Sequence, residues 1–118
     1  MIWVRIASIL MFFAVALGAF GSHALRGKLT DYYLEVYKTG VLYHFIHALG
    51  LFVVAWLSTQ TQDSKVALAG IFMLTGIVLF SGSLYLLSVT GQKWLGAITP
   101  LGGLSFLFAW LLLFTVKL

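Results

Sequence analysis

The sequence has 118 residues, of which 62% are hydrophobic and only 8% carry a charge. A soluble domain has about a quarter of its residues charged, so this chain cannot cover a water-facing surface, and its length allows a single domain, residues 1–118. It contains no cysteine, which excludes disulfides, iron–sulfur clusters and thiol catalysis. The seven Lys and Arg residues are scattered, so the net charge of +4 does not indicate nucleic-acid binding.

Charged residues divide the sequence into four uncharged runs, residues 6–25, 39–62, 66–92 and 94–116. A helix needs about 20 mostly apolar residues to cross the hydrocarbon of a bilayer, and these runs lack the polar alternation of a membrane β-barrel strand. We therefore predict an all-α fold, an integral membrane bundle of four transmembrane helices. The predicted spans lie near residues 3–21, 41–58, 66–88 and 96–116.

The first run also resembles a secretory signal peptide, because Arg5 precedes it and the small-x-small motif Ser22-His23-Ala24 ends it. Very few residues precede Arg5, however, and the small residues of this run give it a role in helix packing. We expect the first helix to be retained. Loss of this segment in an intact-mass measurement would contradict the four-helix prediction.

The connection at residues 22–40 is the longest, and it contains a signal for the start of a helix. Thr30 is a good N-cap residue, and the carboxylate of Asp31 suits the first turn of a helix. We therefore expect the second helix to begin near Asp31, outside the hydrocarbon. Pro100 marks the start of the fourth helix, where its missing N–H costs nothing.

Small residues recur at helical spacing on the first and fourth spans, a pattern that lets membrane helices approach closely. The residues are Ala14, Gly18, Gly21, Gly102, Ser105 and Ala109. The same pattern serves packing within one chain and contact between copies. We expect mainly packing within the chain, with a homo-oligomer contact as the alternative.

The three histidines are the clearest candidate site. His23 ends the first span, and His44 and His47 follow the start of the second, so we expect all three at one side of the membrane. Imidazoles could hold a haem or a small metal ion there. No Cys or carboxylate completes a ligand set, which favours the alternative that these rings form hydrogen bonds between helices.

A turn after the first helix would bring His23 towards His44, with Tyr37 and Tyr85 as hydroxyl neighbours. Ser81 shares a face of the third span with Tyr85, and we expect both to bond between helices or to line a polar pocket. We predict that at least one histidine forms a hydrogen bond across helices in the interior of the bundle, as a structural latch on which any ligand site would be secondary.

The absent groups are equally informative. Asp31, Glu35 and Asp63 are the only acids, and all lie at or outside the predicted interface, whereas ion-coupled transporters usually keep ionisable groups along their path. No phosphate-binding loop, nucleophile elbow or zinc-protease motif is present. We therefore predict no enzymatic activity, no catalytic residue, no metal and no cofactor.

Four motifs together are similar to those of one known family. They are Gly18–Leu25 (GAFGSHAL, resembling GAFGAHAL), Tyr43-His44 with His47–Leu49, Phe80–Tyr85 (FSGSLY) and Gly96–Gly103 (GAITPLGG). They resemble the YgdD/YwdK family of small bacterial membrane proteins, which has a eukaryotic transmembrane relative. The resemblance implies four membrane helices in the bacterial plasma (inner) membrane and supplies no activity and no catalytic residue.

Our leading functional hypothesis is a non-enzymatic membrane protein that supports membrane integrity or a partner complex. Its expected partners are the lipid bilayer and a second copy or another membrane protein, not nucleic acid. The alternative is haem or metal binding by His23, His44 and His47. A small-solute channel or a lipid-binding protein is the weaker alternative, because no ring of charges lines a pore.

Overall fold

The computed structural model describes residues 2–118, which form four helical segments long and apolar enough to cross a membrane. The first two segments are α1 (Ile2–His23) and α2 (Asp31–Gln60). The third consists of α3 (Lys65–Gly76), the π-helical turn η1 (Ile77–Ser81) and α4 (Gly82–Thr90). The fourth consists of the 3₁₀-helix η2 (Lys93–Ala97) and α5 (Thr99–Phe114). The all-α transmembrane fold predicted from the sequence is thereby confirmed.

The ends of the helices follow from local chemistry. The Thr30 hydroxyl accepts a hydrogen bond from the Tyr33 N–H at 3.2 Å, so Thr30 caps α2, which begins at Asp31 as expected. Gly91 ends α4 with a φ of 72°, a left-handed conformation that glycine adopts most easily. Pro100 lies in the first turn of α5, where no N–H is needed.

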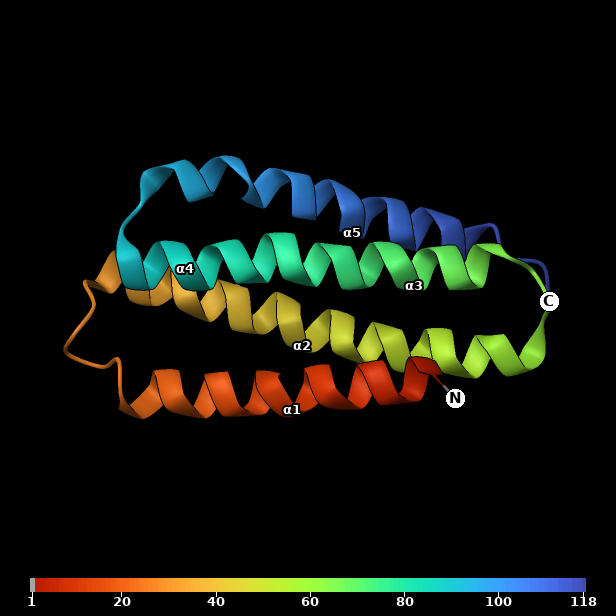
Figure 1. Ribbon diagram of the computed structural model, residues 1–118, viewed down its shortest axis with the longest axis horizontal. Helices are drawn as coiled ribbons and strands as arrows, with labels where there is room; N and C mark the ends of the chain where they lie inside the picture. The colour runs from red at the N-terminus through yellow and green to blue at the C-terminus, as the bar shows by residue number, and fades with distance from the viewer. Residues whose placement is uncertain (1) are drawn as a thin grey trace.

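The helices form a flattened bundle of 48 × 26 × 17 Å with a central pair and two outer members. Figure 1 shows α2 beside the α3–η1–α4 segment in the middle, with α1 along one side and α5 along the other. Half of the residues in the apolar 18-residue stretch of α2 are buried inside the protein. The corresponding shares are 11% for α1 and 22% for the η2–α5 segment. The outer helices therefore present most of their surface to the surroundings.

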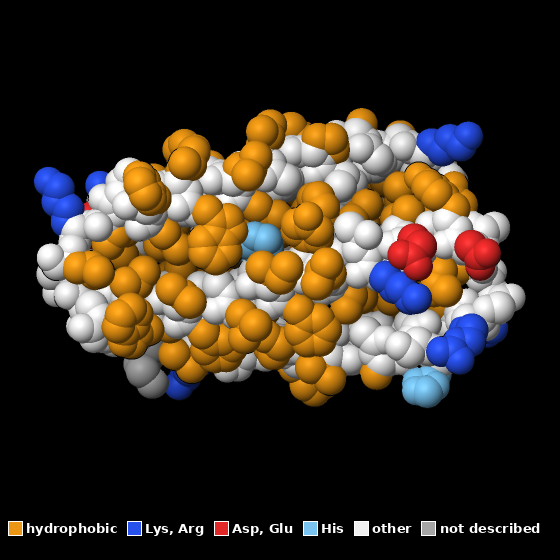
Figure 2. Space-filling view, turned by 180° about the vertical axis from the view of Figure 1, so that it is seen from behind, with side chains coloured by type: hydrophobic (Ala, Val, Ile, Leu, Met, Phe, Trp, Pro, Cys, Tyr) orange, Lys and Arg blue, Asp and Glu red, His pale blue; other side chains and the backbone are white. Residues whose placement is uncertain are grey.

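Lipid is the natural surrounding of this surface. Large apolar side chains are exposed along every segment, and Figure 2 shows them over the middle of one face, with Lys, Arg, Asp and Glu at the two ends. Both termini lie at one end and the α1–α2 connection at the other (Figure 1), as a chain with four crossings requires. Below, these are called the terminal end and the loop end.

The interior differs between the two ends. The main apolar cluster lies in the half near the terminal end, where Leu51, Val54 and Leu57 of α2 pack with Met73 and Phe106. The half near the loop end combines a smaller apolar cluster of Leu84, Leu87 and Leu95 with buried polar side chains. Helices approach closely at η1, because a Cβ atom on Gly102 would lie only 2.3 Å from the Phe80 backbone nitrogen.

Candidate functional site

The six small residues expected to mediate helix packing all lie at contacts within the chain. Ala14 is fully buried, and Gly21 packs so tightly on the Tyr37 ring that an added Cβ would lie 2.2 Å from it. A Cβ on Gly18 would meet Val41 at 3.3 Å. On α5, Gly102 packs on η1, and the buried residues Ser105 and Ala109 follow along the same helix, with the Ser105 hydroxyl donating to the Phe72 carbonyl at 2.7 Å.

The expectation that His23 joins the other histidines is wrong. His23 is exposed at the end of α1, close to the level at which Gly21 contacts Tyr37. His44 lies a further ~10 Å along α2 from Tyr37, at 1.5 Å per residue. The reason is that α2 is already buried at Tyr37, beside the end of α1, so His44 and His47 lie about two or more turns deeper in the bundle while His23 remains at the surface.

His44 belongs to a buried polar cluster at the junction of α1, α2 and α4. Its Nδ1 lies 2.8 Å from the Tyr85 hydroxyl, which is the hydrogen bond between helices that the sequence predicted. Its side chain is 4% exposed. The Ser81 hydroxyl donates to the Gly40 carbonyl at 2.7 Å, and the Tyr37 hydroxyl donates to the Leu17 carbonyl. The cluster therefore joins three helical segments.

His47 forms a second connection, from α2 to α5. Its Nδ1 lies 2.8 Å from the Tyr43 carbonyl, which can only accept, so Nδ1 carries the proton. Its Nε2 accepts from the Trp110 indole N–H at 3.0 Å, and its ring stacks on Phe106 with centroids 3.5 Å apart. Because an indole only donates, this geometry defines one neutral tautomer of His47, with both nitrogens bonded.

This arrangement does not provide the histidine ligand set considered above. Both nitrogens of His47 and one of His44 are engaged within the protein, and His23 is remote. Among residues 2–118, no group of three or more His, Asp or Glu side chains is placed to hold a metal ion. The histidines of α2 are thus contacts between helices.

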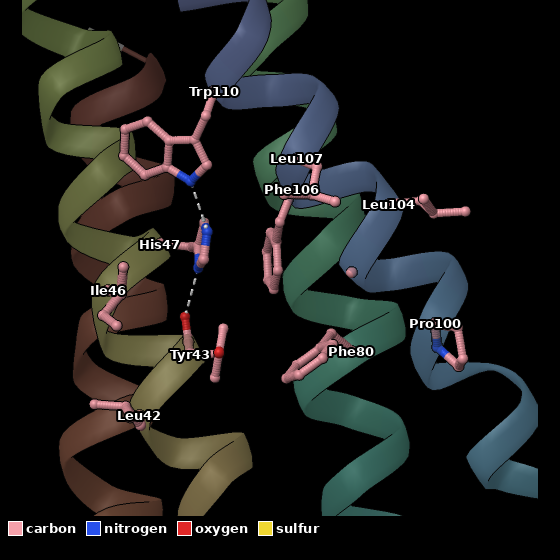
Figure 3. Close-up of a pocket in the computed structure, with 11 residues that line it drawn as sticks. Leu42, Tyr43, Ile46, His47, Phe80, Pro100, Leu104, Phe106, Leu107 and Trp110 are labelled. Carbon is pink, nitrogen blue, oxygen red and sulfur yellow. Dashed lines mark hydrogen bonds between the residues drawn. The ribbon is translucent and has the colours of Figure 1, made fainter.

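An apolar groove lies beside His47 (Figure 3), and no motif in the sequence indicates it. It lies between α2 and α5, has a volume of about 710 Å³, and includes Phe80 of η1 in its wall. Tyr43 and Trp110 also line it and are 37% and 41% exposed. In a membrane span, an aromatic residue is normally read as a lipid-facing side chain. That these aromatic residues of separate helices line one groove is therefore visible only in the tertiary structure.

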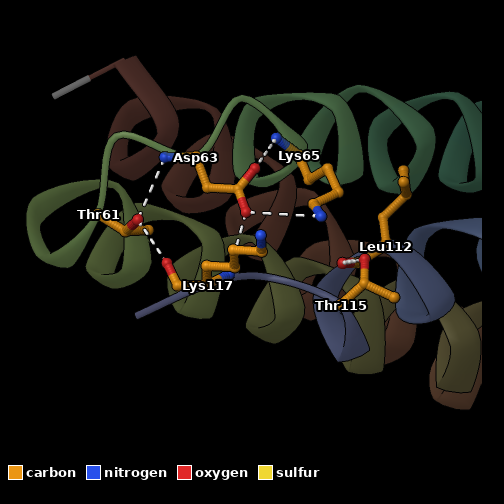
Figure 4. Close-up of polar contacts among 6 residues, drawn as sticks. All are labelled: Thr61, Asp63, Lys65, Leu112, Thr115 and Lys117. Atoms are coloured by element: carbon orange, nitrogen blue, oxygen red, sulfur yellow. Dashed lines mark hydrogen bonds and ion pairs between the residues drawn. The ribbon is translucent and has the colours of Figure 1, made fainter.

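A polar clamp closes the terminal end of the bundle (Figure 4). The carboxylate of Asp63 accepts from the Lys117 and Lys65 backbone N–H groups, both at 3.0 Å, and its Oδ2 lies 3.7 Å from the Lys65 ammonium. These N–H groups, that of Lys117 first, and the Lys65 charge lower the pKa of Asp63 below its usual value. The Thr61 hydroxyl donates to the Lys117 carbonyl at 2.7 Å, so the C-terminal segment is held against the α2–α3 connection.

These features define a small α-helical membrane protein that crosses the bilayer four times. The chain belongs to the family described as "Protein of unknown function (DUF423)", which matches residues 17–103. It is 53% identical over 113 residues to UPF0382 membrane protein YwdK of Bacillus subtilis (strain 168), covering 95% of this chain and 92% of the relative.

A second relative is UPF0382 membrane protein SH2409 of Staphylococcus haemolyticus (strain JCSC1435). The two sequences are 47% identical over 100 residues, which cover 85% of this chain and 81% of the relative. No solved structure matches the chain. The resemblance to the YwdK group found in the sequence motifs is confirmed, and the family has no assigned function.

Proposed function

We propose that this protein is a non-enzymatic component of the bacterial plasma membrane that supports membrane integrity or the assembly of a membrane-protein complex. The observation that carries the proposal is the small buried share of α1. This helix is long enough to span the membrane, yet only 11% of its apolar 18-residue stretch is buried within the chain. A helix of this kind offers its surface to lipid and to other membrane helices, so we expect it to act through lateral contacts within the membrane.

The use of the interior polar groups supports a non-enzymatic role. A general acid or base must reach the proton that it transfers, whereas both nitrogens of His47 are bonded within the protein. The hydroxyls of Ser81 and Ser105 donate to backbone carbonyls of neighbouring segments. Asp63 is clamped at the terminal end. These side chains serve the contacts between helices and connections.

The interior weighs against the channel alternative. A conducting path needs polar groups or a water-filled space across the whole membrane. In the half of the bundle near the terminal end, the fully buried side chains of Leu51, Val54 and Met73 occupy the space between the helices. The polar cluster around His44 therefore leads into an apolar core.

The plasma membrane is the compartment that fits a helical fold. Outer-membrane proteins of bacteria are typically β-barrels, and the two relatives described above are both bacterial proteins named as membrane proteins. Lateral association would use α1, where Phe12 and Phe13 are 63% and 48% exposed and stack edge to face. The small residues Ala14 and Gly21 form the face of α1 that packs against the rest of the chain, so the face with Phe12 and Phe13 is available to a partner.

The test is an in-frame deletion complemented with wild-type and variant protein. We expect the deletion to increase uptake of a membrane-impermeant dye or to reduce one membrane complex on native gels. Wild-type protein should restore the phenotype and Phe12→Ala/Phe13→Ala should not, whereas Leu111→Ala, at an equally exposed position of α5 (62%), should behave as wild type. A deletion strain unchanged in both assays would overturn the proposal.

A further inference from the structure

We propose that the groove between α2 and α5 is a specific site for one acyl chain of a glycerophospholipid, with the Tyr43 hydroxyl donating a hydrogen bond to the ester carbonyl of that chain. The groove has a volume of about 710 Å³, within the ~300–1,000 Å³ typical of small-molecule pockets. Its wall is formed by Ile46, Phe80, Leu104 and Trp110 together with Tyr43.

The depth of the groove in the membrane determines the chemistry of its occupant. Tyr43 lies about 7 Å deeper along α2 than Lys38, at 1.5 Å per residue, and Lys38 is the last charged residue before the apolar part of that helix. The groove thus begins just inside the hydrocarbon. Its apolar walls offer water few partners, whereas the chains of surrounding lipids are present throughout this region.

Tyr43 supplies the one polar contact that distinguishes a lipid with an ester from a bare hydrocarbon chain. Its ring is held in place, with its centroid 4.7 Å from that of Phe80, and it stacks on His47 at 6.2 Å. None of the hydrogen bonds among the described residues involves its hydroxyl, although Tyr85 and Tyr37 both have partners. A hydroxyl in hydrocarbon without a partner is unfavourable, so this position favours a ligand with an acceptor.

The position of Tyr43 along α2 brings it near the level of lipid ester carbonyls. It lies less than two helical turns from Lys38, the residue that marks the edge of the apolar part of α2. Ester carbonyls lie at that boundary between headgroups and chains. The helix of a second copy would be a poorer partner, because its backbone carbonyls are already bonded within the helix.

The floor of the groove is rigid before a ligand arrives. The Trp110 N–H bond to His47 and the stacking of His47 on Phe106 fix the rings between α2 and α5. A preformed site of this kind binds without first ordering its side chains, which favours affinity. The contacts of His47 thus support the groove as well as the bundle.

The experiment uses the full chain reconstituted in vesicles containing equal amounts of a diester and a diether phosphatidylcholine with the same chains, followed by gentle extraction and native mass spectrometry. Gly103→Leu blocks the groove, because a Cβ at this position would lie 3.8 Å from Phe80 without a clash. Gly96→Leu is the matched control, since nothing lies within 4 Å of its added Cβ. Circular dichroism confirms that each variant is folded.

We expect wild-type protein to retain one phospholipid and to prefer the diester about two- to tenfold, the value of one neutral hydrogen bond. Gly103→Leu should lose the retained lipid and Gly96→Leu should keep it. Tyr43→Phe should retain lipid with no preference between ester and ether. Three results for wild-type protein would overturn the site. They are retention of no phospholipid, retention of an isoprenoid quinone instead, and formation of a dimer that Gly103→Leu abolishes. Equal retention of diester and diether by wild type would overturn the role of Tyr43.

Discussion

The buried hydrogen bond between His44 and Tyr85 allows a quantitative test of how the helices are held together. Tyr85→Phe removes only the hydroxyl, which lies 2.8 Å from His44 Nδ1. Hydrogen bonds between membrane helices contribute about 0.6 kcal/mol on average and up to ~1.7 kcal/mol. The variant leaves the buried Nδ1 of His44 without its partner, and an unsatisfied buried polar group costs about 1–3 kcal/mol. We expect the free energy of unfolding to fall by about 1–3 kcal/mol.

Reversible unfolding in mixed micelles of a mild detergent and sodium dodecyl sulfate, followed by circular dichroism, measures this change. Tyr43→Phe is the control, because it removes a hydroxyl from the same residue type at a position without a hydrogen bond in the protein; we expect a change below ~0.5 kcal/mol, the lower bound for one hydrogen bond. The variant pair His44→Ala and Tyr85→Phe should also couple, since each removes the partner of the other. A Tyr85→Phe protein as stable as wild type would refute the view that this bond is a latch.

Three further predictions concern the packing, a helix cap and the clamp. Gly102→Ala should destabilise the protein by about 1–3 kcal/mol in the same unfolding assay, since its Cβ would clash with the Phe80 backbone nitrogen. Gly103→Ala should be nearly neutral, because its Cβ would lie 3.8 Å from the Phe80 ring. Equal effects of the two variants would show that α5 adjusts freely. Thr30→Ala should lower stability by about 0.5–2 kcal/mol through loss of the cap on α2, and an unchanged thermal transition would contradict this. The pKa of Asp63 is lowered in the folded state, so the stability that this carboxylate contributes is complete above its unfolded pKa of about 3.9 and is lost as the pH falls through its folded pKa. The thermal transition temperature of wild type should therefore drop more steeply below about pH 4 than that of Asp63→Asn. Parallel pH profiles of the two proteins would contradict the clamp.

The helices could be predicted from the sequence because their signals are local. The length of an uncharged run and the position of a cap depend on neighbouring residues alone. Thr30 and Asp31 thus define the start of α2. The wrong expectation for His23 has the same origin: an uncharged run shows where a span begins but not where the helix becomes buried, and α2 enters the protein interior earlier, at Tyr37.

The groove and the π-helical turn depend on contacts between distant segments. Residues 77–80 include no Gly, Pro or polar residue that would predict a π-helical turn, and the close approach of Gly102 to Phe80 involves α5. The pairing of Trp110 with His47 also joins residues from separate spans. Periodicity could place the histidines on the buried face of α2, but it could not identify their partners.

The division of the interior explains why both polar and apolar contacts are present. Lipid solvates apolar side chains as well as a protein core does, so apolar burial alone does not hold membrane helices together. Near the loop end, the bonds from Tyr85 to His44 and from Ser81 to Gly40 provide attraction that lipid cannot replace. Near the terminal end the core is apolar, and there the carboxylate of Asp63 ties the C-terminal segment to the α2–α3 connection through Lys117. The two ends therefore use different interactions for the same purpose, and at the terminal end acid should weaken the clamp by protonating Asp63.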